Sequence, residues 1–409
     1  MRTNAVLTEG VETRACEETL RVDVEALAPL ERLAGSDDER RAAEWIAARL
    51  TAAGADARVD EEEFLDGFAP LLAAISAAGA VSGLAALGER GRTLGIAGGS
   101  AAAALIADEV SNGLRPARRA AAARKTTWNV VAELGDRSAD RTLVLMAHHD
   151  AARTGVAFDQ TAQRKLTDWF PGVIERIDTS VPQWWGAVAA PAMVAAGAAT
   201  RRRGLTAAGV AICVLSTALL ADIARSPVVP GANDNLSAVA VLVSVAEALR
   251  ERPVSGLRVI LASCGAEEVL QGGIYGFAAR HLADLDRERT WLLNFDTVGS
   301  PELAMLEGEG TMVMEDYFDR GLRDLCARIA DREGIPMRRG MRARSSTDAV
   351  IPSRMGIPTA CFASLNRHKG LSNYHQPTDT PDRLRYKTVA CAADLAEAIV
   401  RELAAPAAT

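Results

Sequence analysis

The stretch LVLMAHHDAA carries side chains that could bind a divalent metal at the end of an apolar run. Residues two apart in an extended chain point to the same side, so His148 and Asp150 can face one pocket. A metal-binding histidine usually donates its other N–H to a carboxylate. We therefore predict His148 as a metal ligand and Asp150 as its supporting acid, with His149 pointing away. The alternative is a histidine pair that binds no metal.

Two further stretches add carboxylates. In PGANDNLSAVAVLV, Asp234 is either a turn or cap residue or a carboxylate shared between two cations. In LRVILASCGAEEVLQGG, the neighbours Glu267 and Glu268 follow an apolar run, where burial is costly unless cations pair with them. A solvated acidic helix start is the alternative. We predict Glu268 as a metal ligand and Glu267 as the general base toward an attacking water.

The last two candidates are Asp296, at the end of WLLNFD, and His375, in the loop NYHQPTDTPDRL. Each alone is explained by loop and cap preferences. Together, however, all candidates lie at or beyond the carboxyl ends of predicted strands, where open α/β sheets build their sites. Histidine and carboxylate ligands without thiolates suit a hydrolytic zinc pair. His281 and His368 lack such a context and are predicted to be surface residues.

The elements that must position these residues alternate between strand and helix. Predicted strands are residues 57–59, 127–134, 141–150, 257–263, 291–296 and 358–364, and predicted helices include residues 235–250, 317–334 and 386–404. Another helix begins at Ser36, where Ser36 and Glu39 form a capping box. This alternation predicts an α/β fold with a mixed, largely parallel central sheet flanked by helices.

Two pairs of uncharged segments interrupt this alternation, each pair turning at a basic loop. The segments are residues 68–87 with 93–107, and residues 181–200 with 204–221. About 17–25 apolar residues are needed to cross a bilayer, and three of the four segments reach that length. Trp184 and Trp185 lie at one end of a segment, as in an aromatic belt. We favour membrane association through residues 68–107 and 181–221; soluble hairpins that pack together or form a dimer are the alternative.

These segments divide the chain. We predict a catalytic domain from residues 1–67, 113–180 and 226–409, with inserted apolar helical hairpins at residues 68–112 and 181–225. The basic turns, set against the acidic residues 60–66, favour turns in the cytoplasm and an enzyme outside. No apolar stretch follows Arg2, so no signal peptide is expected. The lack of a signal peptide argues instead for a catalytic domain on the cytoplasmic side. The side of the membrane stays open, and without insertion the protein would be cytoplasmic.

The composition excludes other classes. A net charge of -7 and a pI near 5.5 argue against nucleic-acid binding. The six cysteines form no CxxC pair, so neither a disulfide framework nor a thiolate zinc site is predicted.

The ordered set of His-x-Asp, Asn-Asp-Asn, Glu-Glu, Asp after a strand and Tyr-His-x-Pro-x-Asp resembles family twenty-eight of the metallopeptidases. The resemblance covers residues 30–67 and 125–404 and implies a zinc-exopeptidase (phosphorylase/hydrolase-like) fold. It implies one zinc on His148 and Asp296, a second on Glu268 and His375, and Asp234 as the bridge. It also implies a cis peptide bond between Asp234 and Asn235. The long gap between His148 and Asp234, which holds the second hairpin, departs from the family.

The resemblance implies an exopeptidase of the aminopeptidase type, with two zinc or other divalent ions, that acts on a peptide or small amide. A carboxypeptidase or other amidohydrolase on the same metals is the alternative. It would need a cation for the substrate carboxylate, and Arg342 and Arg344 are candidates unless they form a solvated basic loop. A glutaminyl cyclase of the family would use one zinc. A metal-free membrane- or partner-binding protein would have lost ligands, and none is missing. The oligomeric state is not predicted.

Overall fold

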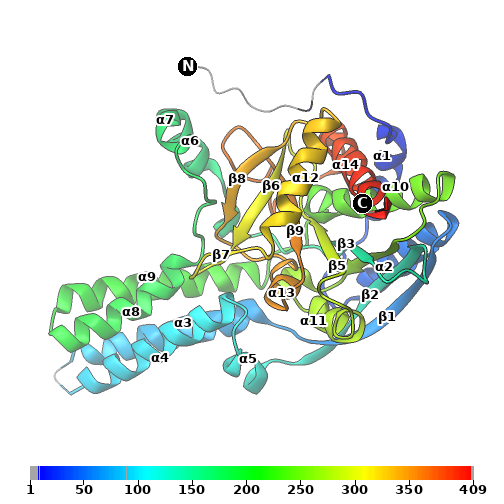
Figure 1. Cartoon of the computed structure of the whole chain (residues 1–409). Helices are drawn as coiled ribbons and strands as arrows, with labels where there is room; N and C mark the ends of the chain where they lie inside the picture. Colours follow the sequence, from blue (N-terminus) through cyan, green and yellow to red (C-terminus); the bar gives the residue numbers. More distant parts are fainter. Residues whose placement is uncertain (1–7, 9, 89, 407–409) are drawn as a thin grey trace.

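The computed structural model describes residues 8, 10–88 and 90–406. Residues 1–7 of the N-terminal stretch and Glu89 of the GERGR turn lie outside the described residues. A single sheet forms the centre of the chain (Figure 1). Its strands are β1 (Asp56–Leu65), β2 (Arg124–Gly135), β3 (Thr142–His148), β4 (Arg258–Cys264), β5 (Thr290–Phe295), β6 (Glu302–Glu309), β7 (Glu315–Asp316), β8 (Arg338–Ala343) and β9 (Thr359–Leu365).

The strand order is β1-β2-β4-β3-β5-β9-β6-β7, with β8 paired to β6. Strands β4, β3, β5 and β9 run parallel, whereas β1, β2 and β6 join the sheet by antiparallel pairing. The predicted fold class, a mixed and largely parallel sheet with flanking helices, is therefore confirmed. Strand β3 is buried along its whole length because it lies inside the parallel part of the sheet. Since β4, β3, β5 and β9 run in the same direction, their carboxyl ends meet at one edge of the sheet.

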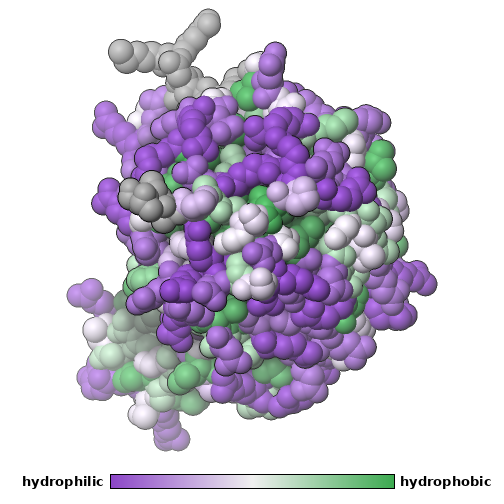
Figure 2. All heavy atoms as spheres, turned by 45° about the vertical axis from the view of Figure 1, so that its right-hand side comes forward, coloured by the Kyte–Doolittle hydropathy of each residue, from purple (hydrophilic) through white to green (hydrophobic). Residues whose placement is uncertain are grey.

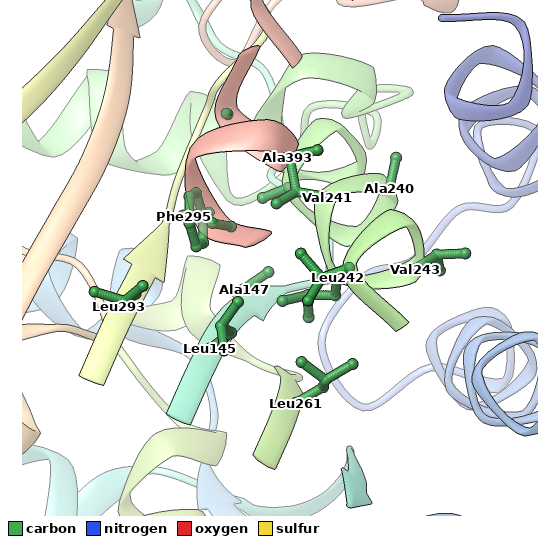
Figure 3. Close-up of a cluster of buried hydrophobic side chains, with 14 of the residues drawn as sticks. Leu145, Ala147, Ala240, Val241, Leu242, Val243, Leu261, Leu293, Phe295 and Ala393 are labelled. Carbon is green, nitrogen blue, oxygen red and sulfur yellow. The ribbon is translucent and has the colours of Figure 1, made fainter. Parts of the chain in front are cut away.

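Helices cover both faces of the sheet. They are α1 (Glu17–Leu27), α2 (Asp37–Ala52), α10 (Ser237–Glu251), α11 (Gly273–Phe277), α12 (Arg320–Arg332), α13 (Val350–Arg354) and α14 (Tyr386–Ala404). Three further helices, α5 (Pro116–Ala121), α6 (Thr161–Trp169) and α7 (Pro171–Ile174), lie away from the sheet (Figure 1). Helices α1, α2, α10, α12 and α14 share one core with Leu145, Leu261 and Leu293 of the sheet. Val144 and Met146 face the other way, toward α11 and α13. Figure 3 shows Leu242 of α10 above Leu145 and Leu261.

Helix α2 begins as its sequence predicts, but the Glu39 side chain does not complete the predicted capping box. The Ser36 hydroxyl accepts the Glu39 backbone N–H at 3.1 Å, which caps the helix. The Glu39 carboxylate accepts the backbone N–H groups of Gly35 at 2.7 Å and Ala266 at 2.9 Å. Ala266 directly precedes Glu267, so the start of α2 supports the candidate site.

The apolar segments form a bundle of four helices that projects from the sheet domain (Figure 1). The helices are α3 (Phe68–Ala86), α4 (Arg92–Val110), α8 (Trp185–Thr200) and α9 (Arg203–Ile223). Helix α3 packs on α4 and α9, and α8 packs on the same two helices. A Cβ on Gly99 would lie 2.7 Å from the Pro191 carbonyl, and one on Gly209 2.7 Å from the Ala190 carbonyl, so glycine permits these close approaches.

By length and composition alone, four helical stretches could cross a membrane. Three are α3, α4 and α9; the fourth, Ala232–Glu251, is 83% buried and belongs to the sheet core. Helix α8 is shorter, because the segment predicted to begin at residue 181 becomes helical only at Trp185.

Both hairpins leave and re-enter the sheet domain at neighbouring points. Leu65 at the end of β1 pairs with Arg124 at the start of β2, so the chain closes around the first hairpin. Around the second, the Thr154 N–H bonds to the Pro227 carbonyl at 3.0 Å. The bundle can therefore be inserted without moving the strands that position the candidate site.

Candidate metal centre

The structure brings the five predicted ligands together at the carboxyl edge of the parallel strands. Asp234 lies between the two histidines. Its Oδ1 is 3.3 Å from Nε2 of His148, and its Oδ2 is 3.3 Å from Nε2 of His375. Asp296 Oδ2 lies 4.0 Å from His148 Nε2, and Glu268 Oε2 lies 3.0 Å from His375 Nε2.

These distances define two groups of three donors that share Asp234. One group is His148, Asp234 and Asp296, and the other is Asp234, Glu268 and His375. Within each group the donor atoms lie within 4.8 Å of one another. A third group, His148 with Glu267 and Glu268, also meets this distance.

The donor set fits zinc. Among the described residues, both ring nitrogens of His148 and His375 and Oε1 of Glu268 are buried without a hydrogen-bond partner. Buried polar atoms normally have partners, and a cation would supply one. Imidazole and carboxylate donors, with no thiolate among them, are typical of catalytic zinc sites that keep an open position.

The electrostatics of the cluster also favour a cation. Burial raises the pKa of Glu268 to about 7 and that of Asp296 to about 6, with the charge of Asp234 adding to both. Burial lowers the pKa of His375, but the negative charges of Glu268 and Asp234 outweigh this effect and raise the value to about 10. Carboxyl groups crowded in this way repel one another until a cation balances them.

Asp150 contacts three of the predicted site residues and supports their positions. Its Oδ1 lies 3.4 Å from Nδ1 of His148, as expected for a supporting acid. Its two oxygens also accept the backbone N–H groups of Glu267 at 2.9 Å and Glu268 at 3.0 Å. His149 points away: its Nδ1 lies 2.9 Å from the Ser263 hydroxyl, and burial lowers its pKa to about 4, so it is neutral.

Glu267, the predicted base, faces the donor cluster. Its Oε2 lies 4.0 Å from Nε2 of His148, and its Oε1 accepts a hydrogen bond from Gln271 at 2.8 Å. Burial, together with the charges of Asp348 and Glu268, raises its pKa well above the usual range. A high proton affinity is a property that a general base needs.

Sequence reasoning missed several buried residues that hold the site. The Asp379 carboxylate accepts the backbone N–H groups of Asn233 at 2.9 Å and Asp234 at 3.1 Å. Arg32 donates to the carbonyls of His149 and Pro230, each at 2.8 Å. It thereby ties the end of β3 to the Asp234 turn, across the inserted hairpin.

Asp348 is a further buried acid near the cluster. Both of its carboxylate oxygens lack a hydrogen-bond partner among the described residues. Burial raises its pKa well above the usual range, and the charges of Asp150 and Asp296 contribute. Its sequence context, SSTDAV, gave no signal, whereas the TDTP context of Asp379 lies within the loop already singled out for His375.

The remaining predictions concern residues around the site. The Asp234–Asn235 peptide bond is cis, as the resemblance implied. His281 lies 2.7 Å from Asp60, and His368 hydrogen-bonds Thr167; both are partly buried rather than on the surface, because these partners hold them.

Comparison with known proteins relates part of the chain to a known family. Residues 218–400 match the model of Peptidase family M28. This range includes Asp234, Glu267, Glu268, Asp296 and His375 and begins after His148. No curated protein matches the chain in sequence.

Solved structures with similar folds include aminopeptidases and glutaminyl cyclases. An aminopeptidase from Aneurinibacillus sp. strain AM-1 matches at 16% identity and a TM-score of 0.55, over 97% of this chain and 94% of that one. BSAP, a zinc aminopeptidase from Bacillus subtilis, matches at 15% identity and a TM-score of 0.57, over 96% of both chains. Bacteroides thetaiotaomicron glutaminyl cyclase matches at 12% identity and a TM-score of 0.57, over 95% of this chain and 99% of that one. The zinc-exopeptidase fold and the resemblance to Peptidase family M28, carried in sequence by residues 218–400, are thus confirmed.

Proposed function

We propose that this chain is a zinc-dependent exopeptidase of the aminopeptidase type that uses two metal ions. The observation that carries the proposal is the pair of donor groups that share Asp234, with Glu267 beside them. His148 and Asp296 would hold one ion, Glu268 and His375 the other, and Asp234 would bridge them. Bound zinc supplies a lowered pKa for a coordinated water and polarisation of a substrate carbonyl.

The residues of the chain have distinct roles in amide hydrolysis. Glu267 accepts a proton from the attacking water through Oε2, because Gln271 already occupies Oε1. Glu267 then passes that proton to the leaving amine. Asp150 holds the backbone of Glu267 and Glu268 and orients His148, so the base and both histidine–carboxylate groups keep their relative positions.

The carboxypeptidase alternative has less support. Arg342 pairs with Asp316 at 2.8 Å, and Arg344 stacks over Trp185 at 5.2 Å. Neither lines the cavity beside His375 and Glu268, where a substrate carboxylate would need a cation. The cations that do line it have other partners: Lys125 pairs with Asp66 at 2.7 Å, and Arg153 donates to the Ser226 carbonyl at 2.6 Å. The glutaminyl cyclase alternative requires one metal, whereas the two donor groups that share Asp234 offer places for two.

The test uses Glu267→Gln, with the wild type as reference, against three substrate types: amino-acid anilides, N-acylated amino acids and N-terminal glutaminyl peptides. The wild type should cleave the anilides. Glu267→Gln should keep its zinc and lose about 10²–10⁴-fold in turnover, because only proton transfer is removed. Full activity in this variant would refute the assignment of the base, and cleavage of only N-acylated amino acids or cyclisation of only glutaminyl peptides would refute the aminopeptidase type.

We further propose that the four-helix bundle inserts into a membrane. Apolar side chains face outward from it: Val81, Leu84, Leu94, Val214 and Leu215 are each more than half exposed. Helices of 19 residues span about 28 Å, close to the ~30 Å hydrocarbon core of a bilayer. Figure 2 shows hydrophobic surface at the lower left, the side from which the bundle projects.

The two ends of the bundle differ in charge. The far turns carry five exposed arginines: Arg90, Arg92, Arg201, Arg202 and Arg203. At the near end, Trp184 packs against Phe68 and the Trp185 indole donates to the Thr311 carbonyl at 2.8 Å. Arginine-rich turns favour the cytoplasmic side and tryptophans favour the interface. This arrangement supports an orientation with the catalytic domain on the outer side.

A further inference from the structure

The cavity beside the candidate metal centre has walls from two parts of the chain. Its volume is about 190 Å³. Its lining includes Glu268 and His375 and also the first residues of α3 and the last of α9, among them Phe68 and Ile223. The bundle therefore does more than project from the enzyme, because its base closes the pocket in which a substrate would sit.

Phe68 joins the bundle to the metal side of the cavity. Its ring packs against the cluster that contains Phe64 and Val269, and also against the bundle cluster that contains Leu72 and Ile106. Val269 directly follows Glu268, a proposed ligand. One layer of side chains thus separates the start of α3 from the proposed ligands.

Helix α9 reaches the site by a second route. The Asp222 carboxylate, in its last turn, accepts the Val156 backbone N–H at 2.8 Å. Val156 begins the short turn that ends at Phe158. The Phe158 ring meets the His375 ring edge-on, with centroids 4.4 Å apart, so the last turn of α9 fixes the turn that carries this pocket wall.

The chemistry of the cavity favours an apolar side chain. Most of its wall is aliphatic or aromatic, contributed by Leu33, Phe68, Phe158, Ile223 and Val269, with several alanines. Three charged residues also line it: Lys125 and Asp66 pair with each other at 2.7 Å, and Arg153 donates to the Ser226 carbonyl at 2.6 Å. A volume of about 190 Å³ is below the ~300–1,000 Å³ of drug-sized pockets, so it suits one amino-acid side chain.

We infer that the base of the inserted bundle forms the specificity pocket of the enzyme, with Phe68 and Ile223 selecting substrates that carry a large apolar N-terminal side chain. The inference rests on the proposed exopeptidase function. Phe68 and Ile223 act as specificity-determining residues, since each contributes wall rather than a polar contact. Shortening Phe68 removes a surface that a leucine side chain would touch and an alanine side chain would not.

The test measures, in the full-length protein, the ratio of kcat/KM for leucine anilide to that for alanine anilide. Phe68→Ala should lower this ratio by about 10-fold or more, because even one methylene in an apolar pocket is worth at least that much discrimination. Phe68→Trp narrows the cavity and should therefore also lower the leucine-to-alanine ratio. Phe68→Leu keeps most of the apolar wall and should change this ratio less than Phe68→Ala does. Leu84→Ala, 57% exposed near the far end of the same helix, is the control and should leave the ratio unchanged.

A second measurement, of inhibitor binding, does not require the protein to cleave a substrate. The ratio of dissociation constants for leucine and alanine hydroxamates, measured by calorimetry on zinc-loaded protein, should change in parallel. A ratio that Phe68→Ala and Phe68→Trp leave unchanged, or that Leu84→Ala changes equally, would overturn the pocket inference while the peptidase proposal stands. If no anilide is cleaved but the hydroxamate ratio responds to Phe68, the pocket inference stands and the aminopeptidase proposal fails.

Discussion

At the scale of single residues, two glutamates on β6 illustrate how surroundings decide the charge of a carboxyl group. Glu309 Oε2 accepts hydrogen bonds from the Tyr317 hydroxyl at 2.7 Å and the Thr347 N–H at 3.0 Å, while its Oε1 is buried without a partner among the described residues. Burial raises its pKa to about 8. Glu307 is also penalised by burial, but hydrogen bonding to Arg339 and the charge of Arg323 outweigh this and lower its pKa.

We predict that Glu309→Gln becomes progressively more stable than the wild type as pH rises from 5 to 9. A folded-state pKa raised from 4.5 to about 8 gives stability that is present below pH 4.5 and is lost as pH rises through 8. Glutamine keeps the oxygen that accepts the hydrogen bonds and cannot ionise. Thermal unfolding at several pH values should show a relative gain on the order of 2 kcal/mol or more, since one pKa unit is worth about 1.4 kcal/mol.

Glu307→Gln is the matched control on the same strand. Its lowered folded-state pKa means that the wild-type group stabilises the protein above pH 4.5 and loses this effect as pH falls below that value. The control should therefore be less stable than the wild type by a constant amount from pH 5 to 9. A flat difference for Glu309→Gln as well would contradict the account of its burial.

The residues that sequence reasoning could identify are those with recognisable local context. His148, Asp234 and Glu268 each follow an apolar run or a turn that points to a strand edge. Asp348 and Arg32 could not be found in this way, because what makes them important is burial beside segments distant in sequence. Long-range contacts of this kind carry no local pattern.

At the scale of elements, the four-helix bundle is an addition to the sheet domain that carries the candidate site. Its helices were predictable because runs without charge are visible in the sequence. The sequence could not predict that the base of the bundle lines the cavity beside the candidate metal centre. This depends on where the ends of α3 and α9 meet the sheet edge. The capped start of α2 was likewise predictable, whereas the contact of Glu39 with Ala266 depends on how α2 packs on β1 and β2 and on where the segment after β4 lies.

We predict that the native protein stays in the membrane fraction after salt and carbonate washes and is released by detergent. Val214, 54% exposed in the middle of α9, would then face lipid, so Val214→Arg should shift protein to the soluble or degraded fraction. A charge at the centre of a spanning helix costs about 2.5–3.5 kcal/mol. Fractionation followed by immunoblotting measures the distribution.

Val22→Arg provides the control, because Val22 is equally exposed, at 54%, but lies on α1 in the catalytic domain. It should leave the distribution unchanged. Release of the wild type by salt or carbonate alone would contradict insertion of the bundle, and so would equal behaviour of the two arginine variants.

At the scale of the whole molecule, the sheet edge that carries the candidate metal site tolerates two long insertions, because the chain returns close to where it left at each of them. The strand pairing of Leu65 with Arg124 and the bond from Thr154 to Pro227 restore the path of the chain. The order of metal-binding motifs along the sequence therefore predicts the fold and the site edge, despite the inserted residues. How the bundle sits on that edge required the three-dimensional arrangement.

The central claim, a two-metal hydrolytic site, is tested most directly by the zinc content of the purified, zinc-loaded protein. The account predicts two ions per wild-type chain, a lower content for Glu268→Ala, and an unchanged content for Asp382→Ala, an exposed acid in the same loop as His375. One ion or none per wild-type chain, or equal content in the wild type and Glu268→Ala, would contradict it.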